Sequence, residues 1–274
     1  MTARQGRESR KMLIVIKGAG DLASGIALRL HHSRFDVVMT DLPVPLAVRR
    51  TVAFSEAVRL GSTQVEDVRA ERAENEDEVR DCLRRGVIPV MPDPEAKIIG
   101  IMKPEIVVDA ILAKVNTGTD IDDAPLVIGV GPGFEAGKDC DAVVETKRGH
   151  TLGRVIRKGS AIANTGVPGN IGGQTINRLI KASADGIFHP EKNIGDTVKE
   201  GDRVGNVDGI PVLAKTDGMI RGLLQDGVPV TKGLKSGDVD PRGDIIDYMS
   251  VSDKALSIGG GVLEAVMGYA GDRL

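Results

Sequence analysis

The fold is predicted from the stretch Leu13-Ile14-Val15-Ile16-Lys17-Gly18-Ala19-Gly20-Asp21-Leu22-Ala23-Ser24-Gly25. Its first five residues are a short apolar run rich in β-branched side chains, which predicts a strand, and the pattern over 22–33 predicts a helix. Between them, Gly18, Gly20 and Ala23 fit G-x-G-x-x-A, in which the first glycine permits a tight turn. The second glycine lets a phosphate approach the backbone, and the small third residue lets helix and strand pack closely. We therefore expect a nucleotide-binding βα unit here.

Three acidic or small residues refine this expectation. Asp41 closes the next predicted strand, 21 residues after Gly20, where an acid can bond a ribose hydroxyl. Gly25 belongs to the same loop-to-helix junction. Asp21, however, directly follows the second glycine, where its charge would face an incoming phosphate. The alternative that the turn holds no ligand therefore stays open.

Downstream of this unit, short β-branched runs alternate with amphipathic stretches, which predicts parallel strands joined by crossover helices. The predicted class is α/β, with a Rossmann-like parallel sheet domain over residues 12–135. The predicted strands are Leu13–Lys17, Asp36–Thr40, Thr63–Val68, Val87–Met91, Ile106–Asp109 and Leu126–Val130, and the predicted helices are Leu22–Ser33, Leu46–Leu60, Glu76–Arg84 and Glu95–Met102.

Glycines break up the chain after the last of these strands. Leu126–Val130 runs into Gly131-Pro132-Gly133-Phe134, so Gly131 and Gly133 would lie at the carboxyl end of a sheet strand. Open α/β folds bind their ligands at that edge. We therefore include both glycines in the predicted cofactor-binding set.

A Gly-rich central segment, 136–180, carries charged and amide side chains on its predicted loops. Arg148, Arg154 and Asn164 suit recognition of an anionic ligand, because Arg offers a planar fork of donors. His150 is the only candidate for a catalytic residue, and a weak one. A base needs a nucleophile or leaving group nearby, and the sequence identifies none.

Residues 181–246 form a predicted smaller β-rich module. Gly195–Gly205 and Gly227–Gly237 both fit G-x-x-V-x-x-G-x-x-x-G, which looks like the barrel-sandwich hybrid of biotinyl and lipoyl domains. The connection Asn206–Val212 has no lysine, so no carrier lysine is expected. Residues 247–274 are predicted to form a helical segment that Ser252 or Asp253 can cap, with a kink or break at Gly259-Gly260-Gly261.

Composition narrows the function. The chain has 274 residues, a net charge of −3, no Trp, two Tyr and four Phe. The negative net charge does not favour binding of duplex nucleic acid, and the few aromatic side chains offer little stacking surface for the bases of a single strand. We therefore expect no nucleic-acid partner. Cys82 and Cys140 are in neither metal-ligand nor CxxC spacing, so no metal site is predicted and a reducing, cytoplasmic location is expected. We expect no secretory signal and no membrane span.

Several motifs, taken in order, resemble the selenium-dependent molybdenum hydroxylase system proteins, an accessory family. They are Gly18–Gly25, Pro45–Phe54, Gly131–Phe134, Glu145–Arg154, Asn164–Gly166, Gly237–Arg242 and Gly260–Ala265. The resemblance implies an accessory or maturation role for selenium-dependent molybdenum hydroxylases, with such an enzyme or its maturation factors as partners.

On this interpretation the chain binds a nucleotide, of NAD(P) type or the dinucleotide portion of a molybdopterin cofactor. An NAD(P)-dependent oxidoreductase using the Gly18–Ala23 loop is one alternative. A non-catalytic protein-interaction scaffold with an empty glycine loop is another. The sequence discloses neither the reaction nor the oligomeric state.

Overall fold

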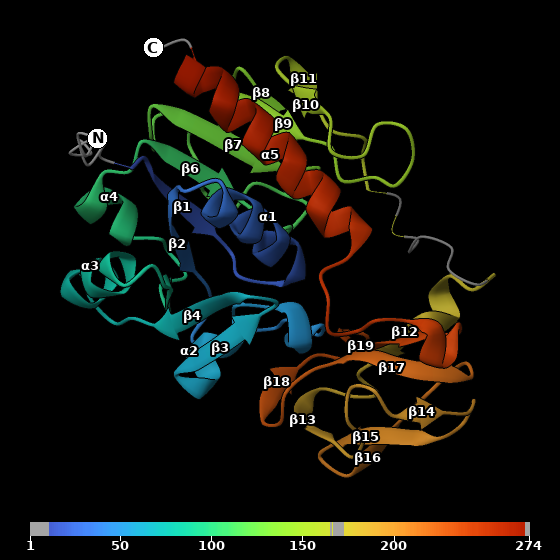
Figure 1. Ribbon diagram of the computed structural model, residues 1–274. Helices are drawn as coiled ribbons and strands as arrows, with labels where there is room; N and C mark the ends of the chain where they lie inside the picture. The colour runs from blue at the N-terminus through green and yellow to red at the C-terminus, as the bar shows by residue number, and fades with distance from the viewer. Residues whose placement is uncertain (1–10, 165, 167–172, 272–274) are drawn as a thin grey trace, which may run out of the picture.

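The computed structural model describes residues 11–164, 166 and 173–271, which form two lobes (Figure 1). The larger lobe is built on a nine-stranded sheet, and the smaller lobe contains two four-stranded sheets. The last helix, α5 (Asp253–Gly271), follows the smaller lobe in sequence but lies across the larger one (Figure 1).

The nine-stranded sheet contains β1 (Leu13–Lys17), β2 (Asp36–Thr40), β3 (Ser62–Val65), β4 (Val68–Arg72), β5 (Ile88–Met91), β6 (Ile106–Asp109), β7 (Leu126–Val130), β9 (Ala142–Val144) and β10 (Val155–Ile156). Its strand order is β10-β9-β7-β6-β1-β2-β5-β4-β3. The other elements of this lobe are α1 (Asp21–His32), the 3-10 turn η1 (Arg50–Val52), α2 (Glu56–Leu60), α3 (Glu76–Arg84), α4 (Ile98–Met102) and the strand pair β8 (Glu135–Ala136) and β11 (Gly159–Ser160).

The predicted Rossmann-like parallel sheet is wrong, because the sheet is mixed. Its central strands, from β9 to β4, pair in parallel, but β10 pairs antiparallel with β9 and β3 pairs antiparallel with β4. The run Thr63–Val68, predicted as one strand, is divided between the two arms of the β3–β4 hairpin. Its turn contains Glu66, whose φ of 53° lies in the left-handed region. The turn is Glu66-Asp67 and contains neither Gly nor Pro, so the apolar and polar residues of the hairpin were read as one continuous strand.

Four predicted strands, β1, β2, β6 and β7, are confirmed with the bounds given above, and so is helix α3. Each of these strands is almost wholly buried, with at most its first residue partly exposed. A continuous apolar run is what a parallel strand covered on both faces requires. The sequence pattern therefore located the buried strands well.

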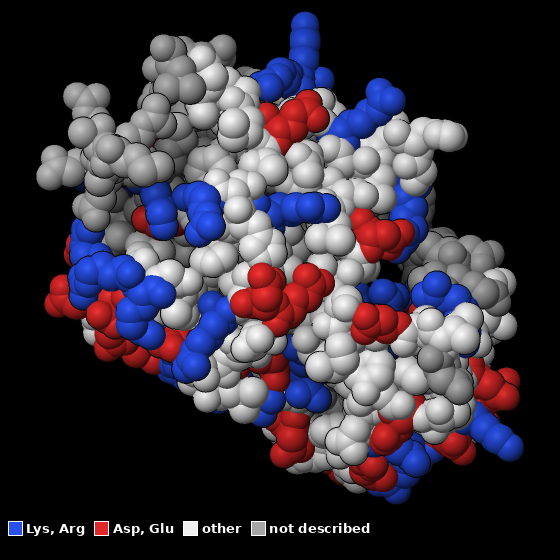
Figure 2. Space-filling model, viewed as in Figure 1, with Lys and Arg blue, Asp and Glu red and all other residues white. Residues whose placement is uncertain are grey.

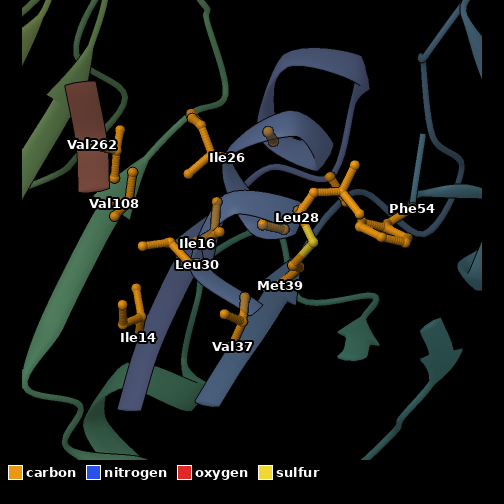
Figure 3. Packing of buried hydrophobic residues seen from close by; sticks show 14 of the residues in the cluster. Ile14, Ile16, Ile26, Leu28, Leu30, Val37, Met39, Phe54, Val108 and Val262 are labelled. Carbon is orange, nitrogen blue, oxygen red and sulfur yellow. The ribbon is translucent and has the colours of Figure 1, made fainter. Parts of the chain in front are cut away.

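Helices cover both faces of the sheet. On one face, Ile14 and Ile16 of β1 pack in the same cluster as Ile26 of α1 and Val262 of α5 (Figure 3). On the other face, Val15 packs in a cluster with residues of α3 and α4. The strands are thus held between two helical layers, which leaves their carboxyl ends as the open edge of the lobe.

The smaller lobe is not the predicted biotinyl- or lipoyl-like module. It consists of two four-stranded antiparallel sheets, ordered β12-β19-β17-β14 and β16-β15-β13-β18, around one apolar core. Its strands are β12 (Leu179–Lys181), β13 (Gly186–Pro190), β14 (Thr197–Val198), β15 (Arg203–Val207), β16 (Ile210–Leu213), β17 (Gly218–Leu223), β18 (Val228–Val230) and β19 (Lys235–Asp240), with 3-10 turns η2 (Ile176–Arg178) and η3 (Gly243–Ile245). The β15–β16 hairpin turns through Asp208 and Gly209, both with positive φ.

The two lobes are joined through a segment that was predicted as helix. Within the predicted helix Leu46–Leu60, the backbone carbonyl of Val48 accepts a 2.7 Å hydrogen bond from the Leu223 N–H of β17. The Nε of Arg50 donates to the Leu223 carbonyl at 2.8 Å. Backbone groups that bond to the other lobe are not free for helical bonds, so only η1 and α2 form here.

Helix α5 packs on α1 through glycines. A Cβ built on Gly25 would lie 2.6 Å from Cβ of Ala255, and one on Gly259 would lie 2.8 Å from the Gly25 carbonyl oxygen. The predicted kink at Gly259–Gly261 is wrong, because α5 is one continuous helix. The predicted cap is confirmed, since Ser252 Oγ accepts the Ala255 N–H at 3.2 Å. These glycines provide close approach rather than flexibility.

The neighbours Gly259 and Gly260 provide a matched test of this packing. Gly259→Ala should lower the free energy of unfolding by about 1–3 kcal/mol, because its methyl group meets α1 backbone. Gly260→Ala, whose Cβ meets nothing within 4 Å, should raise it by about 0.5–1 kcal/mol through helix propensity. Urea denaturation of both variants measures the difference, and equal effects would contradict the glycine-mediated contact.

Candidate functional site: a cationic cleft between the lobes

A cleft of about 630 Å³ opens between the two lobes. Figure 2 shows the molecule hollowed there, with Lys and Arg side chains at the edge of the hollow. The charged residues that line it are Asp21, Arg49, Lys114, Lys147, Arg148, Arg178, Arg221, Lys235, Asp238 and Lys254. Eight cations thus face two carboxylates, although the whole chain has a net charge of −3.

The glycine loop forms one wall of the cleft through Asp21 and Leu22. A Cβ built on Gly20 would meet no heavy atom within 4 Å. Asp21 begins α1, and one of its carboxylate oxygens lies 3.4 Å from Nη1 of Arg49. The carboxylate of Asp21 therefore lies at the cleft where α1 begins. The cationic side chains of the cleft come from elements other than the glycine loop.

Asp41 organises this loop from beneath instead of lining the cleft. Its carboxylate accepts hydrogen bonds from the N–H groups of Ala19 (3.0 Å) and Leu42 (2.7 Å). Burial raises the pKa of Asp41, against the lowering effect of those two bonds. The role predicted for Asp41, bonding a ribose hydroxyl, stays a prediction; its two carboxylate oxygens accept one N–H group of the glycine loop and one of the adjacent Leu42.

Three arginines form the buried part of the cleft: Arg49 from the segment between β2 and η1, Arg178 from η2 and Arg221 from β17. Arg178 is well paired, with Nη1 2.8 Å from a carboxylate oxygen of Asp238, and both side chains are 7% exposed. This pair connects η2, at the start of the smaller lobe, to β19.

Arg221 is poorly neutralised. Its nearest carboxylate, that of Asp240, is 3.8 Å away. Asp240 already accepts bonds from Nε and Nη2 of Arg242 at 2.9 and 2.7 Å. Burial, and then the charge of Arg49, lower the pKa of Arg221. The two guanidinium groups are thus close enough to repel each other.

Unsatisfied donors accompany this repulsion. Among the described residues, Nε and Nη2 of Arg49 and Nε of Arg221 are buried and have no hydrogen-bond partner. The Arg49 side chain is only 8% exposed. A buried charged donor without a partner costs free energy, so a native protein retains one where a ligand or another function uses it.

The rim carries further cations on loops that are themselves firmly held. The buried carboxylate of Glu145 accepts the N–H groups of Thr146 and Lys147 at 2.7 Å each, and that of Ile162 at 2.8 Å. This ties the two loops that contribute Arg148 and Asn164. Arg148 also forms a two-pronged pair with Asp253, at 2.9 and 3.2 Å.

Lys114 comes from a segment with unusual backbone. It follows β6, and both Leu112 and Lys114 have positive φ, 63° and 68°. The segment is held by a buried network at the carboxyl ends of β1 and β6. Lys17 Nζ donates to Thr119 Oγ1 at 2.5 Å, and Thr119 Oγ1 donates to the Asp109 carboxylate at 2.5 Å. Backbone in sparsely populated regions concentrates at functional sites, which agrees with its position at the cleft.

The predicted site residues divide into two groups. Asp21, Arg148 and Asn164 line the cleft. The residues that do not are Gly18, Gly20, Ala23, Gly25, Asp41, Gly131, Gly133, His150 and Arg154. Thr165 and Val167–Asn170, from the glycine-rich loop after Ala163, lie outside the described residues.

Several of the non-lining residues serve packing. A Cβ on Gly18 would lie 2.8 Å from the Ala110 carbonyl oxygen, and one on Gly133 the same distance from the Val115 nitrogen. His150 and Arg154 are exposed. Sequence reasoning missed Arg49, Arg178, Arg221, Lys235 and Lys254. Arg49 and Lys235 stood inside quoted motifs, but no spacing indicated that any of the five belongs to a site.

Neither cysteine belongs to the cleft. Both are buried and free, and burial raises the pKa of the Cys140 thiol to about 11. In the parts of the chain described, no group of three or more His, Cys, Asp or Glu could hold a metal ion. No described helix is both long and apolar enough to cross a membrane.

Comparison with known proteins gives one strong sequence relative. The chain is 53% identical over 259 residues to the uncharacterized protein YqeB of Escherichia coli K12. The match covers 94% of this chain and 48% of that protein. The chain thus spans about half the length of the curated relative it matches. No family model matches it.

Solved structures give only a distant likeness. An aspartoacylase family protein from Mesorhizobium loti is 13% identical with a TM-score of 0.26, and the match covers 84% of each chain. A succinylglutamate desuccinylase/aspartoacylase from Rhodobacter sphaeroides is 16% identical with a TM-score of 0.27, over 84% of this chain and 85% of that one. Likeness at this level carries no reaction over to this chain.

These comparisons do not support the functional prediction. None of the similar proteins is described as an accessory or maturation protein for molybdenum hydroxylases or as an NAD(P)-dependent oxidoreductase. The predicted architecture is corrected by the mixed nine-stranded sheet and the two antiparallel sheets of the smaller lobe. Nothing in the comparisons supports the interaction-scaffold alternative either. The resemblance to the accessory family itself remains a prediction that no comparison tests.

The pairing of the buried arginines predicts opposite effects on stability. Arg178→Met should lower the free energy of unfolding by about 3–5 kcal/mol, because it leaves the Asp238 carboxylate buried without its partner. Arg221→Met should change it by less than about 1 kcal/mol or raise it, because Asp240 keeps both bonds from Arg242. Urea denaturation in a low-salt buffer free of phosphate and sulfate checks this. A large loss in Arg221→Met would show that Arg221 is already well neutralised.

Proposed function

We propose that the chain binds a small anionic metabolite, carrying two or more negative charges, in the cleft between its lobes. The observation that carries the proposal is the buried, partnerless Nε and Nη2 of Arg49 beside the under-neutralised Arg221. An anion that reaches these nitrogens would accept hydrogen bonds from N–H groups that folding has removed from water without giving them a partner.

The dimensions and position of the cleft support a small ligand. Its volume of about 630 Å³ is within the usual range of small-molecule sites. It lies beside the carboxyl ends of β1, β6 and β7, the edge at which open α/β sheets bind their ligands. Its walls come from both lobes, as is common for sites between structural units.

The arrangement of the cations supports more than one negative charge on the ligand. Arg49 and Arg221 are in the buried part, whereas Lys114, Lys147 and Lys235 are exposed at the rim and lie on three different segments. A single small anion would leave most of the six excess positive charges uncompensated. Phosphate esters and polycarboxylates share the required chemistry, and Arg suits both through bidentate bonds.

Pyrophosphate and citrate are suitable probes, with acetate as the single-charge comparison. Arg49→Gln should weaken pyrophosphate binding about tenfold to a hundredfold, because one charge-assisted bond to a buried anion contributes about 1.5–3 kcal/mol. Isothermal titration calorimetry at low ionic strength measures the change, since salt screens the rim charges.

Arg80→Gln is the matched control. Arg80 is an exposed arginine on α3, paired with Glu76, and its loss should leave affinity unchanged. Bound polyanion should also raise the melting temperature of the wild-type chain, because it binds only the folded state. Equal affinity of wild type and Arg49→Gln, or acetate binding as tightly as pyrophosphate, would defeat the proposal.

A further inference from the structure

We propose that the ε-amine of Lys254 forms an imine with the carbonyl carbon of an anionic aldehyde or ketone held in this cleft. The inference rests on the proposed function, because the cleft's cations must first concentrate the anion. It adds a covalent step and narrows the ligand class to oxo-acids and phosphorylated carbonyl compounds.

The position of Lys254 disfavours a positive charge on its amine. Lys254 is the second residue of the 19-residue helix α5 and lines the cleft. The N-terminus of a helix carries a partial positive charge, which destabilises an ammonium group there. The helix is anchored by its glycine contacts with α1, so the backbone that carries Lys254 is held in place at the wall of the cleft.

The charged groups around Lys254 act in both directions: Arg148 and Lys235 lower the pKa of its amine, and Asp21 and Glu145 raise it. Glu145 is saturated by three backbone N–H groups, and Asp21 lies against Arg49. In the described part of the chain, Lys254 itself has no ion pair. Burial, followed by the charge of Arg148, lowers the pKa of Lys254.

Lys254 differs in burial from the other lysines of the cleft. Lys114, Lys147 and Lys235 are exposed, whereas Lys254 is half-buried. An exposed lysine is almost fully protonated at neutral pH and is a poor nucleophile. A desolvated lysine beside another cation is the arrangement that activates amines for imine formation.

The reaction is balanced without a cofactor. The lone pair of the neutral amine attacks the carbonyl carbon to give a carbinolamine, and the C–O bond then breaks. The oxygen leaves as water with the two protons that the amine nitrogen loses, and a C=N bond remains. The anionic group of the substrate would bond to the cleft arginines while the carbonyl carbon faces Lys254.

Two reductive-labelling experiments on the full chain separate nucleophilicity from anion binding. Formaldehyde is uncharged, so its labelling with cyanoborohydride reports the neutral amine alone. Peptide mass spectrometry over a pH series should show half-maximal labelling of Lys254 at a lower pH than that of exposed Lys199 in the same molecule. Arg148→Gln should move the Lys254 midpoint upward, because it removes a neighbouring positive charge.

Glyoxylate, an anionic aldehyde, tests capture in the cleft. With cyanoborohydride it should convert Lys254 to a carboxymethyl-lysine on the order of tenfold faster than Lys199, through electrostatic concentration of the anion. Excess pyrophosphate should suppress this adduct. Lys254→Arg should lose the adduct, and Lys199→Met should behave as wild type.

The outcomes distinguish the two proposals. Adducts spread over Lys147 and Lys235, or a Lys254 midpoint equal to that of Lys199, would overturn the imine and leave anion binding intact. If the wild-type chain does not bind pyrophosphate, the proposed function on which the imine rests is wrong.

Discussion

The close crossing of α5 over α1 is the contact on which the rest of the structure depends. Gly25, Ala255 and Gly259 allow the two helices to meet backbone to backbone, so the chain returns to the larger lobe after building the smaller one. The smaller lobe is therefore attached at both ends and again at Val48, through β17. These three attachments hold the two lobes on either side of the cleft, and the start of α5 places Lys254 at its wall.

The same arrangement creates an electrostatic imbalance. The lobes bring together cations from segments far apart in the chain, while the nearby acids are engaged by backbone N–H groups or by other arginines. Burying Arg49 and Arg221 with unsatisfied nitrogens opposes folding, and the packing of the two apolar cores must offset that penalty. A local loss of stability at residues that line a cleft is characteristic of a binding site.

The sequence predicted the buried strands well and the connections poorly. β1, β2, β6 and β7 were located because their whole length is apolar. The segment from Leu46 was predicted as helix, but its carbonyl groups bond to the smaller lobe. Gly259–Gly261 has low helix propensity, yet tertiary packing keeps α5 continuous. In both cases a long-range contact overrode a local preference.

The candidate site shows the same division. By itself, the sequence determined the strand–glycine–helix unit, the carboxyl edge of the sheet and three cleft residues, Asp21, Arg148 and Asn164, because these depend on short-range pattern. Only the tertiary structure decided that Arg49, Arg221 and Lys254 meet in one cleft. These residues are far apart in sequence, so neither helix nor strand periodicity can show that their charges meet. Whether each cation is neutralised depends on which carboxylates the fold leaves unpaired near it.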